Sequence, residues 1–249
     1  EQTADISLSG ISSWTPIGAG ISKAFKGHYN GKGFKISNLT INSSTDAAST
    51  GAYGLFGFAV GAVISNVGME NVSVTVTMSN ASASGYVGAA AGYLQNGSIE
   101  KSYASGSVST QISGSGKTGG LAGSLSGSTM TSCYNLALVS AAALAGGLAG
   151  YAESSSAVSS SYNLAAVTAA TAGQTVGSKV SCTLTNCYTV GGTDANASAL
   201  TKAAARTQAS WTGFDFDGVW QMGGTAGYPY PQLRGNTHAA QAVTGIDVS

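Results

Sequence analysis

Charged side chains are scarce in this sequence of 249 residues. Asp, Glu, Lys and Arg make up only 8% of it, as ten acidic and ten basic residues with a formal net charge of zero. Ordinary soluble proteins carry about 25% charged residues. The basic residues are scattered singly, so no stretch has the positive potential that holds a phosphate backbone. No nucleic-acid partner is expected.

Long apolar runs and a leader peptide are also missing. Ser, Asn or Gly interrupts every apolar segment before it reaches the roughly 20 residues that a membrane span requires, so no transmembrane segment is expected. The first residues have neither the basic start nor the apolar stretch of a signal peptide, which suggests a mature or excised piece. A folded chain is expected, because 43% of the residues are hydrophobic and disorder normally needs low hydrophobicity with high net charge.

Glycine, in contrast, is abundant, and part of it recurs in a Gly-x-x-Gly pattern. Each copy is followed by an apolar residue and, four positions later, by tyrosine. The tyrosines recur about every 30 residues, a period that suits one coil of a solenoid. The pattern lies at residues 54–57, 120–123 and 147–150, with a degenerate copy at 89–92; the pairs are Ile99 and Tyr103, Met130 and Tyr134, Val158 and Tyr162, and Leu184 and Tyr188, with Ile64 and Gly68 in the first copy.

These repeats predict an all-β fold, a repeat β-solenoid that resembles a parallel β-helix or β-roll. Equivalent residues of successive coils would stack about 4.8 Å apart in parallel ladders. The glycines would allow tight corners that a Cβ atom would obstruct. Residues 177–180 are interpreted as a decayed last copy that has lost the Leu and the second Gly. Three buried rows are expected: Leu55, Ala90, Leu121 and Leu148; Ile64, Ile99, Met130, Val158 and Leu184; and Val108, Val139 and Val167.

The repeats divide the chain into parts. We expect an irregular N-terminal module at residues 1–50, the Gly-x-x-Gly repeats at 51–192 and a C-terminal cap at 193–235, because end coils need covering. The cap should contain a short helix from Ser198 to Thr207, with Ser198 as its N-cap and three consecutive alanines as strong helix formers. Residues 236–249 are interpreted as a linker and the candidate start of an immunoglobulin-like domain, because Val243 to Ser249 resemble the first strand of the bacterial form.

Several segments together resemble the GLUG-repeat family, which occurs in bacterial adhesin-like surface proteins and beside some immunoglobulin A-cleaving peptidases. Residues 4–10, 14–18 and 25–39 are similar to the opening module of that family. Residues 211–220 and 227–231 are similar to its closing segment. The resemblance covers most of the chain, and it implies an extracellular location at a bacterial cell surface.

Catalytic and metal-binding signatures are weak. The glutamates fall singly in different coils, and no His-Glu-x-x-His sequence occurs. Asp215 and Asp217 alternate along an expected strand, but without a third acid a capping or salt-bridging role is favoured over calcium binding. We therefore expect no enzyme and no cofactor. Less favoured alternatives are a polysaccharide-acting β-helix enzyme and an ice-binding protein; the latter is suggested by Ser and Thr in residues 73–77, an array that the other coils are not expected to continue.

Three cysteines give neither an even disulfide framework nor the ligand pairs of a zinc site. Cys133 and Cys187 each precede a repeat tyrosine, so they would lie two coils apart, about 10 Å, which is beyond disulfide reach. Both are interpreted as small buried residues. Cys182 and Cys187 could pair across a tight loop, and this alternative stays open.

The stretches between each tyrosine and the next Gly-x-x-Gly vary in length and should project from one edge. In repeat proteins such an edge is often the binding face. The row of tyrosines could stack against sugars, but its regular spacing favours a structural role. The variable stretches are residues 79–85, 111–117, 141–144 and 171–175, and the candidate ligand-binding residues on them are Gln111, Ser113, Ser115, Lys117, Thr171 and Gln174.

The favoured functional interpretation is an extracellular, adhesin-like module of a bacterial surface protein. It would display loops along the solenoid and bind through several weak contacts. Its partners would be a host or environmental glycan or protein, or adjacent domains of the same chain. The alternative is a structural spacer that supports a neighbouring domain, such as a peptidase.

Overall fold

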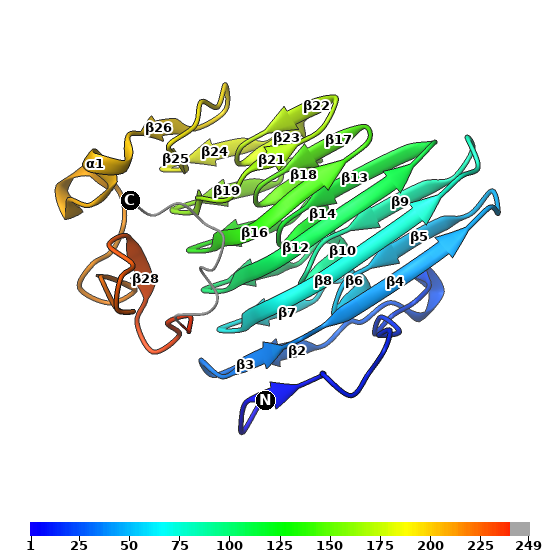
Figure 1. The fold of residues 1–249 in the computed structure, drawn as a ribbon, viewed down its shortest axis with the longest axis horizontal. Coiled ribbons are helices and arrows are strands. Elements are labelled where there is room, and N and C mark those ends of the chain that lie inside the picture. The colour runs from blue at the N-terminus through cyan, green and yellow to red at the C-terminus, as the bar shows by residue number, and fades with distance from the viewer. Residues whose placement is uncertain (240–249) are drawn as a thin grey trace.

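The computed structural model describes residues 1–239 and shows an all-β solenoid of parallel sheets. Each coil passes through four sheets in the order A, D, B and C, and then returns to sheet A one step further along the axis. Figure 1 shows the coils stacked from the N-terminal end to β24, with the long strands of sheet A toward the viewer. The immunoglobulin-like similarity at residues 243–249 lies outside the described residues.

Parallel strands of successive coils pair in each sheet, and their bounds are as follows. Sheet A contains β1 (Ile6–Ser7), β3 (Lys35–Ser37), β4 (Thr40–Thr45), β8 (Gly68–Met78), β12 (Tyr103–Ile112), β16 (Tyr134–Ala141), β20 (Tyr162–Asn163), β21 (Val167–Thr168), β25 (Tyr188–Val190) and β26 (Ser198–Leu200). Sheet D contains β5 (Thr50–Tyr53), β9 (Ser84–Val87), β13 (Ser115–Gly119), β17 (Leu144–Gly146) and β22 (Thr171–Gly173). Sheet B contains β6 (Phe56–Val60), β10 (Ala91–Gln95), β14 (Ala122–Ser126), β18 (Ala149–Glu153) and β23 (Val176–Lys179). Sheet C contains β2 (His28–Asn30), β7 (Val63–Ser65), β11 (Ser98–Glu100), β15 (Thr129–Thr131), β19 (Ala157–Ser159) and β24 (Thr183–Thr185).

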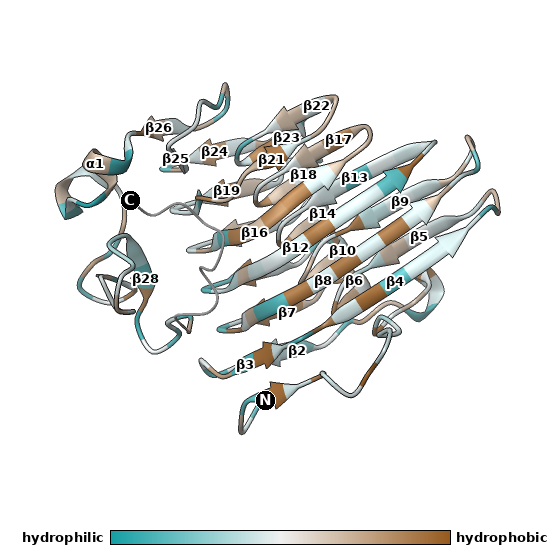
Figure 2. Cartoon of the chain, viewed as in Figure 1, coloured by the Kyte–Doolittle hydropathy of each residue, from teal (hydrophilic) through white to brown (hydrophobic). Residues whose placement is uncertain are grey.

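Buried and exposed residues alternate along the strands of sheet A, as a sheet with one solvated face requires. In β8, Val72, Val74 and Val76 are buried, whereas Ser73 and Thr75 are exposed. The same alternation appears in Figure 2 as brown and pale bands across neighbouring strands.

The predicted rows are confirmed by the strand register. Ile64, Ile99, Met130, Val158 and Leu184 pair in sequence across sheet C. Val108, Val139 and Val167 pair across sheet A. The leucine row with Ala90 is buried at the bend between sheets D and B.

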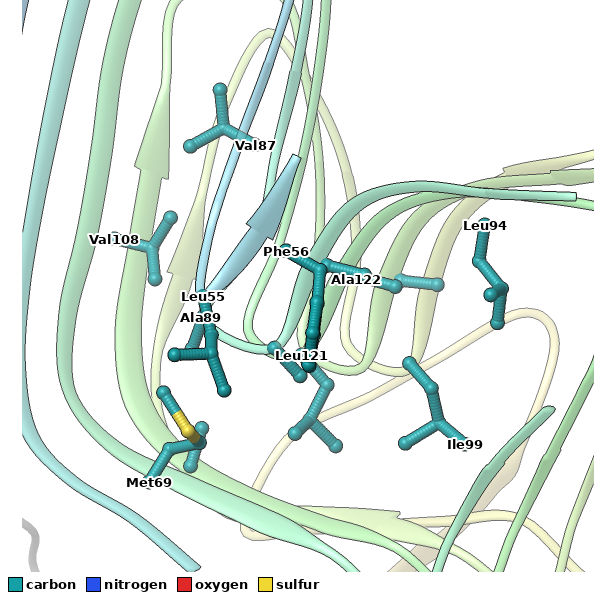
Figure 3. Packing of buried hydrophobic residues seen from close by; sticks show 14 of the residues in the cluster. Leu55, Phe56, Met69, Val87, Ala89, Leu94, Ile99, Val108, Leu121 and Ala122 are labelled. Carbon is teal, nitrogen blue, oxygen red and sulfur yellow. The ribbon is translucent and has the colours of Figure 1, made fainter. Parts of the chain in front are cut away.

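The Gly-x-x-Gly pattern forms the corner at which sheet D passes into sheet B. Figure 3 shows that the chain turns outward here, which gives each coil an L-shaped cross-section. A Cβ atom on the first glycine, Gly120, would overlap the side chain of Asn135 in sheet A. A Cβ atom on the second, Gly123, would overlap the backbone of Val87 in sheet D. The corner can be this tight, and concave on its outer side, because these two positions lack side chains.

The register corrects the position of the last copy. Val176 pairs with Ala149, which places Gly177 in the column of second glycines. The copy therefore spans residues 174–177, and the prediction at residues 177–180 was wrong. Gln174 replaces the first glycine and Thr175 replaces the leucine, so the loss is at the other end of the pattern.

At a different corner, from sheet C into sheet A, residues other than glycine adopt positive φ angles. One residue per coil adopts a φ between 46° and 54° there, a conformation that costs a non-glycine residue roughly 1–2 kcal/mol. Stacking of equivalent corners holds these residues in place. They are Lys32, Asn66, Lys101, Ser132, Ser160 and Asn186.

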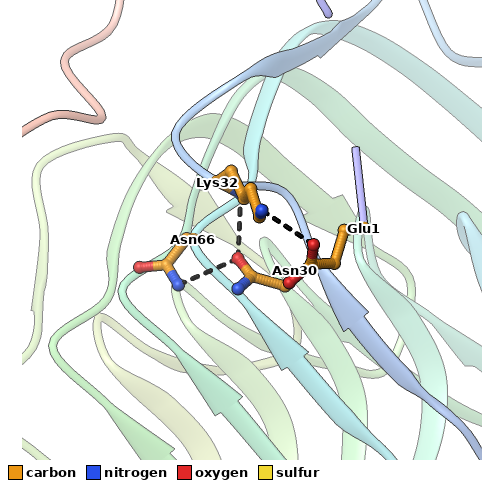
Figure 4. Close-up of polar contacts among 4 residues, drawn as sticks. All are labelled: Glu1, Asn30, Lys32 and Asn66. Atoms are coloured by element: carbon orange, nitrogen blue, oxygen red, sulfur yellow. Dashed lines mark hydrogen bonds and ion pairs between the residues drawn. The ribbon is translucent and has the colours of Figure 1, made fainter. Parts of the chain in front are cut away.

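An ion pair joins the N-terminus to this corner in the first coil, and hydrogen bonds connect the corners of the first two coils. The Nζ atom of Lys32 lies 2.7 Å from Oε2 of Glu1. Oδ1 of Asn30 accepts hydrogen bonds from the Lys32 backbone N–H at 2.9 Å and from Nδ2 of Asn66 at 3.1 Å (Figure 4). These contacts join the N-terminus to the first coil, and the first coil to the second.

The repeat tyrosines form a ladder on the outer face of sheet A. The rings of Tyr103 and Tyr134 stack with centroids 4.8 Å apart, and those of Tyr134 and Tyr162 with centroids 5.3 Å apart. Tyr103 extends over Gly68, which has no side chain to obstruct it. Since Tyr103, Tyr134, Tyr162 and Tyr188 are buried, they offer no free platform for sugars, which agrees with the structural role.

The C-terminal segment is what covers the ladder. It lies beside the starts of β12, β16 and β25, at the left of Figure 1, and contains α1 (Lys202–Ala205), the 3-10 turn η2 (Gln208–Ser210) and the antiparallel pair β27 (Trp220–Met222) and β28 (Pro231–Leu233). Trp211, Phe214 and Trp220 pack on the tyrosine rings. The ladder hydroxyls also form hydrogen bonds with this segment. Those of Tyr103 and Tyr188 donate to the backbone carbonyls of Thr237 and Thr212. The hydroxyl of Tyr134 bonds to Nδ1 of His238, and that of Tyr162 bonds to the hydroxyl of Tyr228.

The short helix begins later than predicted. Ser198 belongs to β26, which pairs with β25, so it does not serve as the N-cap. Thr201 does, because its side-chain oxygen accepts a hydrogen bond from the Ala204 backbone N–H at 3.1 Å. Pairing with the sheet edge overrides the local helix preference of this segment.

All three cysteines are free. Cys133 and Cys187 are buried, as predicted, and burial raises the pKa of each thiol to about 12. Thiols held in the protonated form are unreactive. The alternative Cys182–Cys187 disulfide is not formed in this structure.

His238 should make the contact between the C-terminal segment and the ladder sensitive to pH. Its ring is buried, and Nε2 has no hydrogen-bond partner among the described residues. Burial, with a smaller effect of Lys35, lowers the pKa of His238 from 6.5 to about 4. The unfolded chain takes up this proton below pH 6.5, and the folded protein only near pH 4. Stability should therefore fall as pH falls through this window, by up to roughly 3 kcal/mol.

Urea unfolding at a series of pH values between neutral and acidic checks this prediction. His238→Asn should flatten the dependence, whereas His28→Asn should retain it, because His28 is exposed. Equal slopes for the wild type and His238→Asn would contradict the assignment.

Candidate functional site

The concave corner between sheets D and B forms a groove on the outside of the solenoid. Outward side chains of the two sheets face each other across it. At one end, Ile21, Tyr86, Tyr93 and Gln95 border a hollow of about 430 Å³. The groove columns are Tyr86, Lys117, Leu144 and Thr171 from sheet D, and Phe58, Tyr93, Ser124, Tyr151 and Ser178 from sheet B.

The groove tyrosines differ from those of the ladder. Tyr86 and Tyr93 are half-buried, with ring centroids 5.0 Å apart, and Tyr93 also contacts the ring of Phe58 at 6.0 Å. The hydroxyls of Tyr86, Tyr93 and Tyr151 make no hydrogen bond within residues 1–239. Each therefore offers both a ring face and a polar tip to a ligand.

Lys117 places a positive charge among these rings. Its Nζ atom lies 4.7 Å from the ring centroid of Tyr86 and 5.0 Å from that of Tyr151. No carboxylate of the described residues lies within ion-pair distance of it. Cation–π contacts hold the ammonium in position and leave its N–H groups for other acceptors.

An acidic residue, Glu153, lies on sheet B, farther from the corner than the groove tyrosines. Glu153 follows Tyr151 by two residues on β18 and aligns, through Ser126, with Gln95. Burial, and then the negative charge of Glu153, raises the pKa of Tyr86. Tyr86 thus stays neutral and can donate a hydrogen bond at physiological pH.

The turns between sheets A and D lie along one edge of the molecule (Figure 1). The six candidate residues on these stretches nevertheless occupy different surfaces. Ser115, Lys117 and Thr171 are on the outward side of sheet D, and Lys117 aligns with Thr171 through Leu144. This group borders the groove.

The other three candidates lie elsewhere. Gln111 is exposed near the end of β12, on the outer face of sheet A, and Ser113 is exposed in the turn that follows. Gln174 is half-buried at the corner of the last coil, where it borders a separate hollow of about 480 Å³ with Leu138 and Lys202.

The aromatic groove residues lie outside the variable stretches that hold the candidate ligand-binding residues, so they were not predicted. Their signal lies elsewhere: Phe58, Tyr93 and Tyr151 each follow directly after the second glycine of a Gly-x-x-Gly copy. An aromatic residue recurring at that position could have indicated a shared outward column.

The Ser and Thr array of sheet A extends further than expected. In one column, Asn42, Thr75, Ser109, Ser140 and Thr168 align across five coils, so the expectation that the other coils do not continue the array was wrong for this column alone. The column still varies in side-chain shape. Leu138 interrupts the neighbouring column, so the surface is not a uniform hydroxyl lattice.

The remaining motifs have local structural roles. Oδ1 of Asp215 accepts hydrogen bonds from the backbone N–H groups of Asp217 and Gly218, at 3.0 and 2.9 Å, and so caps a turn. The expected strand at Asp215 and Asp217 is absent, because this segment forms turns. Within residues 1–239, no three His, Cys, Asp or Glu side chains gather as a metal site would require. Nor is any helix of that part long and apolar enough to cross a membrane.

Comparison with known proteins gives a match in structure only. No protein-family model and no curated protein matches the sequence significantly. The fold is similar to the crystal structure of a protein named "putative immunoglobulin A1 protease" from Bacteroides ovatus, with a TM-score of 0.62 and 20% sequence identity. The match covers 93% of this chain and 84% of that chain. At this identity the likeness establishes the β-solenoid fold alone.

Proposed function

We propose that this chain is an extracellular, adhesin-like module of a bacterial surface protein, of the GLUG-repeat type, and that it binds a saccharide in the groove between sheets D and B. The GLUG-like segments and a solenoid with few charges support the surface role. The groove supports the binding role, and no catalytic group needs to be invoked for it.

The observation that carries this proposal is the contrast between the two sets of tyrosines. The ladder hydroxyls bond to the C-terminal segment, and their rings are buried beneath it. Tyr86, Tyr93 and Tyr151 are half-buried, and their hydroxyls are free within the described chain. Flat rings beside polar tips suit the apolar faces and hydroxyl groups of sugars.

A panel of immobilised polysaccharides and glycans tests the proposal. The wild-type chain should bind at least one member, and Tyr93→Ala should weaken that binding about tenfold through the loss of one stacking surface. Gln111→Ala, on the outer face of sheet A, is the matched control and should bind as the wild type does. Antibodies against the chain should label intact cells if the module is at the surface.

The second candidate is a spacer that supports a neighbouring peptidase domain. It is suggested by the protease name of the structurally similar protein and by the stacked architecture. A folded wild-type chain that binds nothing on the panel would favour this role over saccharide binding.

A further inference from the structure

We infer that the groove binds an extended polysaccharide bearing carboxylate groups, which lies along the solenoid axis and crosses successive coils. This inference rests on the proposed saccharide binding and specifies the ligand class. Two features of the groove support it, the spacing of its tyrosines and the position of Lys117. Glu153 provides an opposing charge against which the inference can be tested.

The tyrosines of sheet B set a repeat distance along the groove. Tyr93, Ser124 and Tyr151 occupy the same position in three successive coils. Strands in neighbouring coils are about 4.8 Å apart, so the two tyrosines lie about 10 Å apart along the axis. An extended β-linked polysaccharide repeats its disaccharide over a similar length. Alternate sugars could therefore stack on Tyr93 and Tyr151. Ser124, in the coil between them, is fully buried, so the intervening sugar would not contact it.

The positive charge of Lys117 favours a sugar that carries a negative charge. Lys117 belongs to the same coil as Ser124, between the two tyrosine positions. Its ammonium is held by the rings of Tyr86 and Tyr151 and has no carboxylate partner among residues 1–239. A charged donor beside half-buried rings interacts more strongly with an anion than one in open water does. A uronic-acid carboxylate on the ligand would complete this pair.

Glu153 gives the groove a second, opposing charge. It lies close enough to raise the pKa of Tyr86, but it forms no ion pair with Lys117. Its carboxylate can accept hydrogen bonds from sugar hydroxyls, and it also repels an anionic ligand. The two charges therefore predict opposite effects on the binding of an acidic chain.

The test compares one polyuronate with the same polymer after chemical reduction of its carboxylates. Wild-type protein should bind the acidic form about tenfold more tightly. Lys117→Met should remove this preference, and Glu153→Gln should tighten binding of the acidic form. Gln111→Ala should leave both affinities unchanged. Thermal unfolding of each variant shows that it is folded.

Chain length tests the direction of binding. Because the two tyrosines are two coils apart, a tetrasaccharide or longer fragment should bind much more tightly than a disaccharide. Tyr151→Ala should remove that gain while Lys117→Met retains it. Equal affinity for the disaccharide and a long fragment would overturn the axial arrangement.

The outcomes separate the inference from the proposed function. Equal binding of the acidic and reduced polymers, unchanged by Lys117→Met, would overturn the carboxylate inference and leave saccharide binding standing. Binding to no member of the polysaccharide and glycan panel would overturn both.

Discussion

Replacing Gly123 with alanine should lower the free energy of unfolding by about 3 kcal/mol or more. A Cβ atom at this position would overlap the backbone nitrogen of Val87 and the carbonyl oxygen of Gly92. Both are main-chain atoms of the preceding coil, held by the strand ladders, so they cannot rotate away as a side chain can. The corner between sheets D and B would have to open, and the rows behind it would lose contact.

Urea unfolding and gel filtration of Gly123→Ala measure this effect. Gly10→Ala is the matched control, because nothing lies within 4 Å of the added atom and the backbone is not in the left-handed region. We expect the control to unfold as the wild type does. Wild-type stability of Gly123→Ala would contradict the close approach of the two sheets.

Replacing Trp220 with alanine should release the C-terminal segment from the tyrosine ladder. Trp220 is fully buried, with its ring centroid 4.6 Å from that of Phe214 and 5.9 Å from that of Tyr162. Truncating a buried aromatic residue of this size costs about 3–5 kcal/mol. The ladder and the C-terminal segment form a cluster separate from the core of the solenoid. The loss should therefore stay local.

Hydrogen exchange distinguishes local release from global unfolding. In Trp220→Ala, amides of residues 201–239 should exchange faster, while those of β10 and β14 keep wild-type protection. The near-ultraviolet circular dichroism should weaken because the tyrosine rings lose their packing. Leu138→Ala serves as the control, since Leu138 is 47% exposed. Unchanged exchange in residues 201–239 would show that other contacts hold the segment.

Much of the solenoid could be predicted from the chain because its main contacts are periodic. The pairs from Ile99 and Tyr103 to Leu184 and Tyr188 stack in register because every coil passes through the same sheets. The predicted position of the last Gly-x-x-Gly copy was wrong because the repeat pattern ends there. Thr175 replaces leucine in the last coil and bonds to Asp194 instead of packing under a further coil, so the pattern there was placed three residues late.

Non-periodic contacts were harder to predict. Ser198 was expected to cap a helix, but it joins the edge of sheet A through a contact that no local pattern encodes. The residues with positive φ between sheets C and A include Lys101 and Ser132. Neither is a residue type that by itself predicts a turn of this kind. They adopt this conformation because the coils above and below impose the corner.

The period, the buried rows and the structural role of the tyrosine ladder could be inferred from the residue pattern, because burial repeats whenever equivalent residues stack. The position of Lys117 between Tyr86 and Tyr151 of the neighbouring coils could not be inferred in this way, because it depends on the folded arrangement of the sheets. Which outward side chains converge depends on the angle between sheets D and B. That angle follows from how closely two backbones approach where glycine leaves no side chain between them.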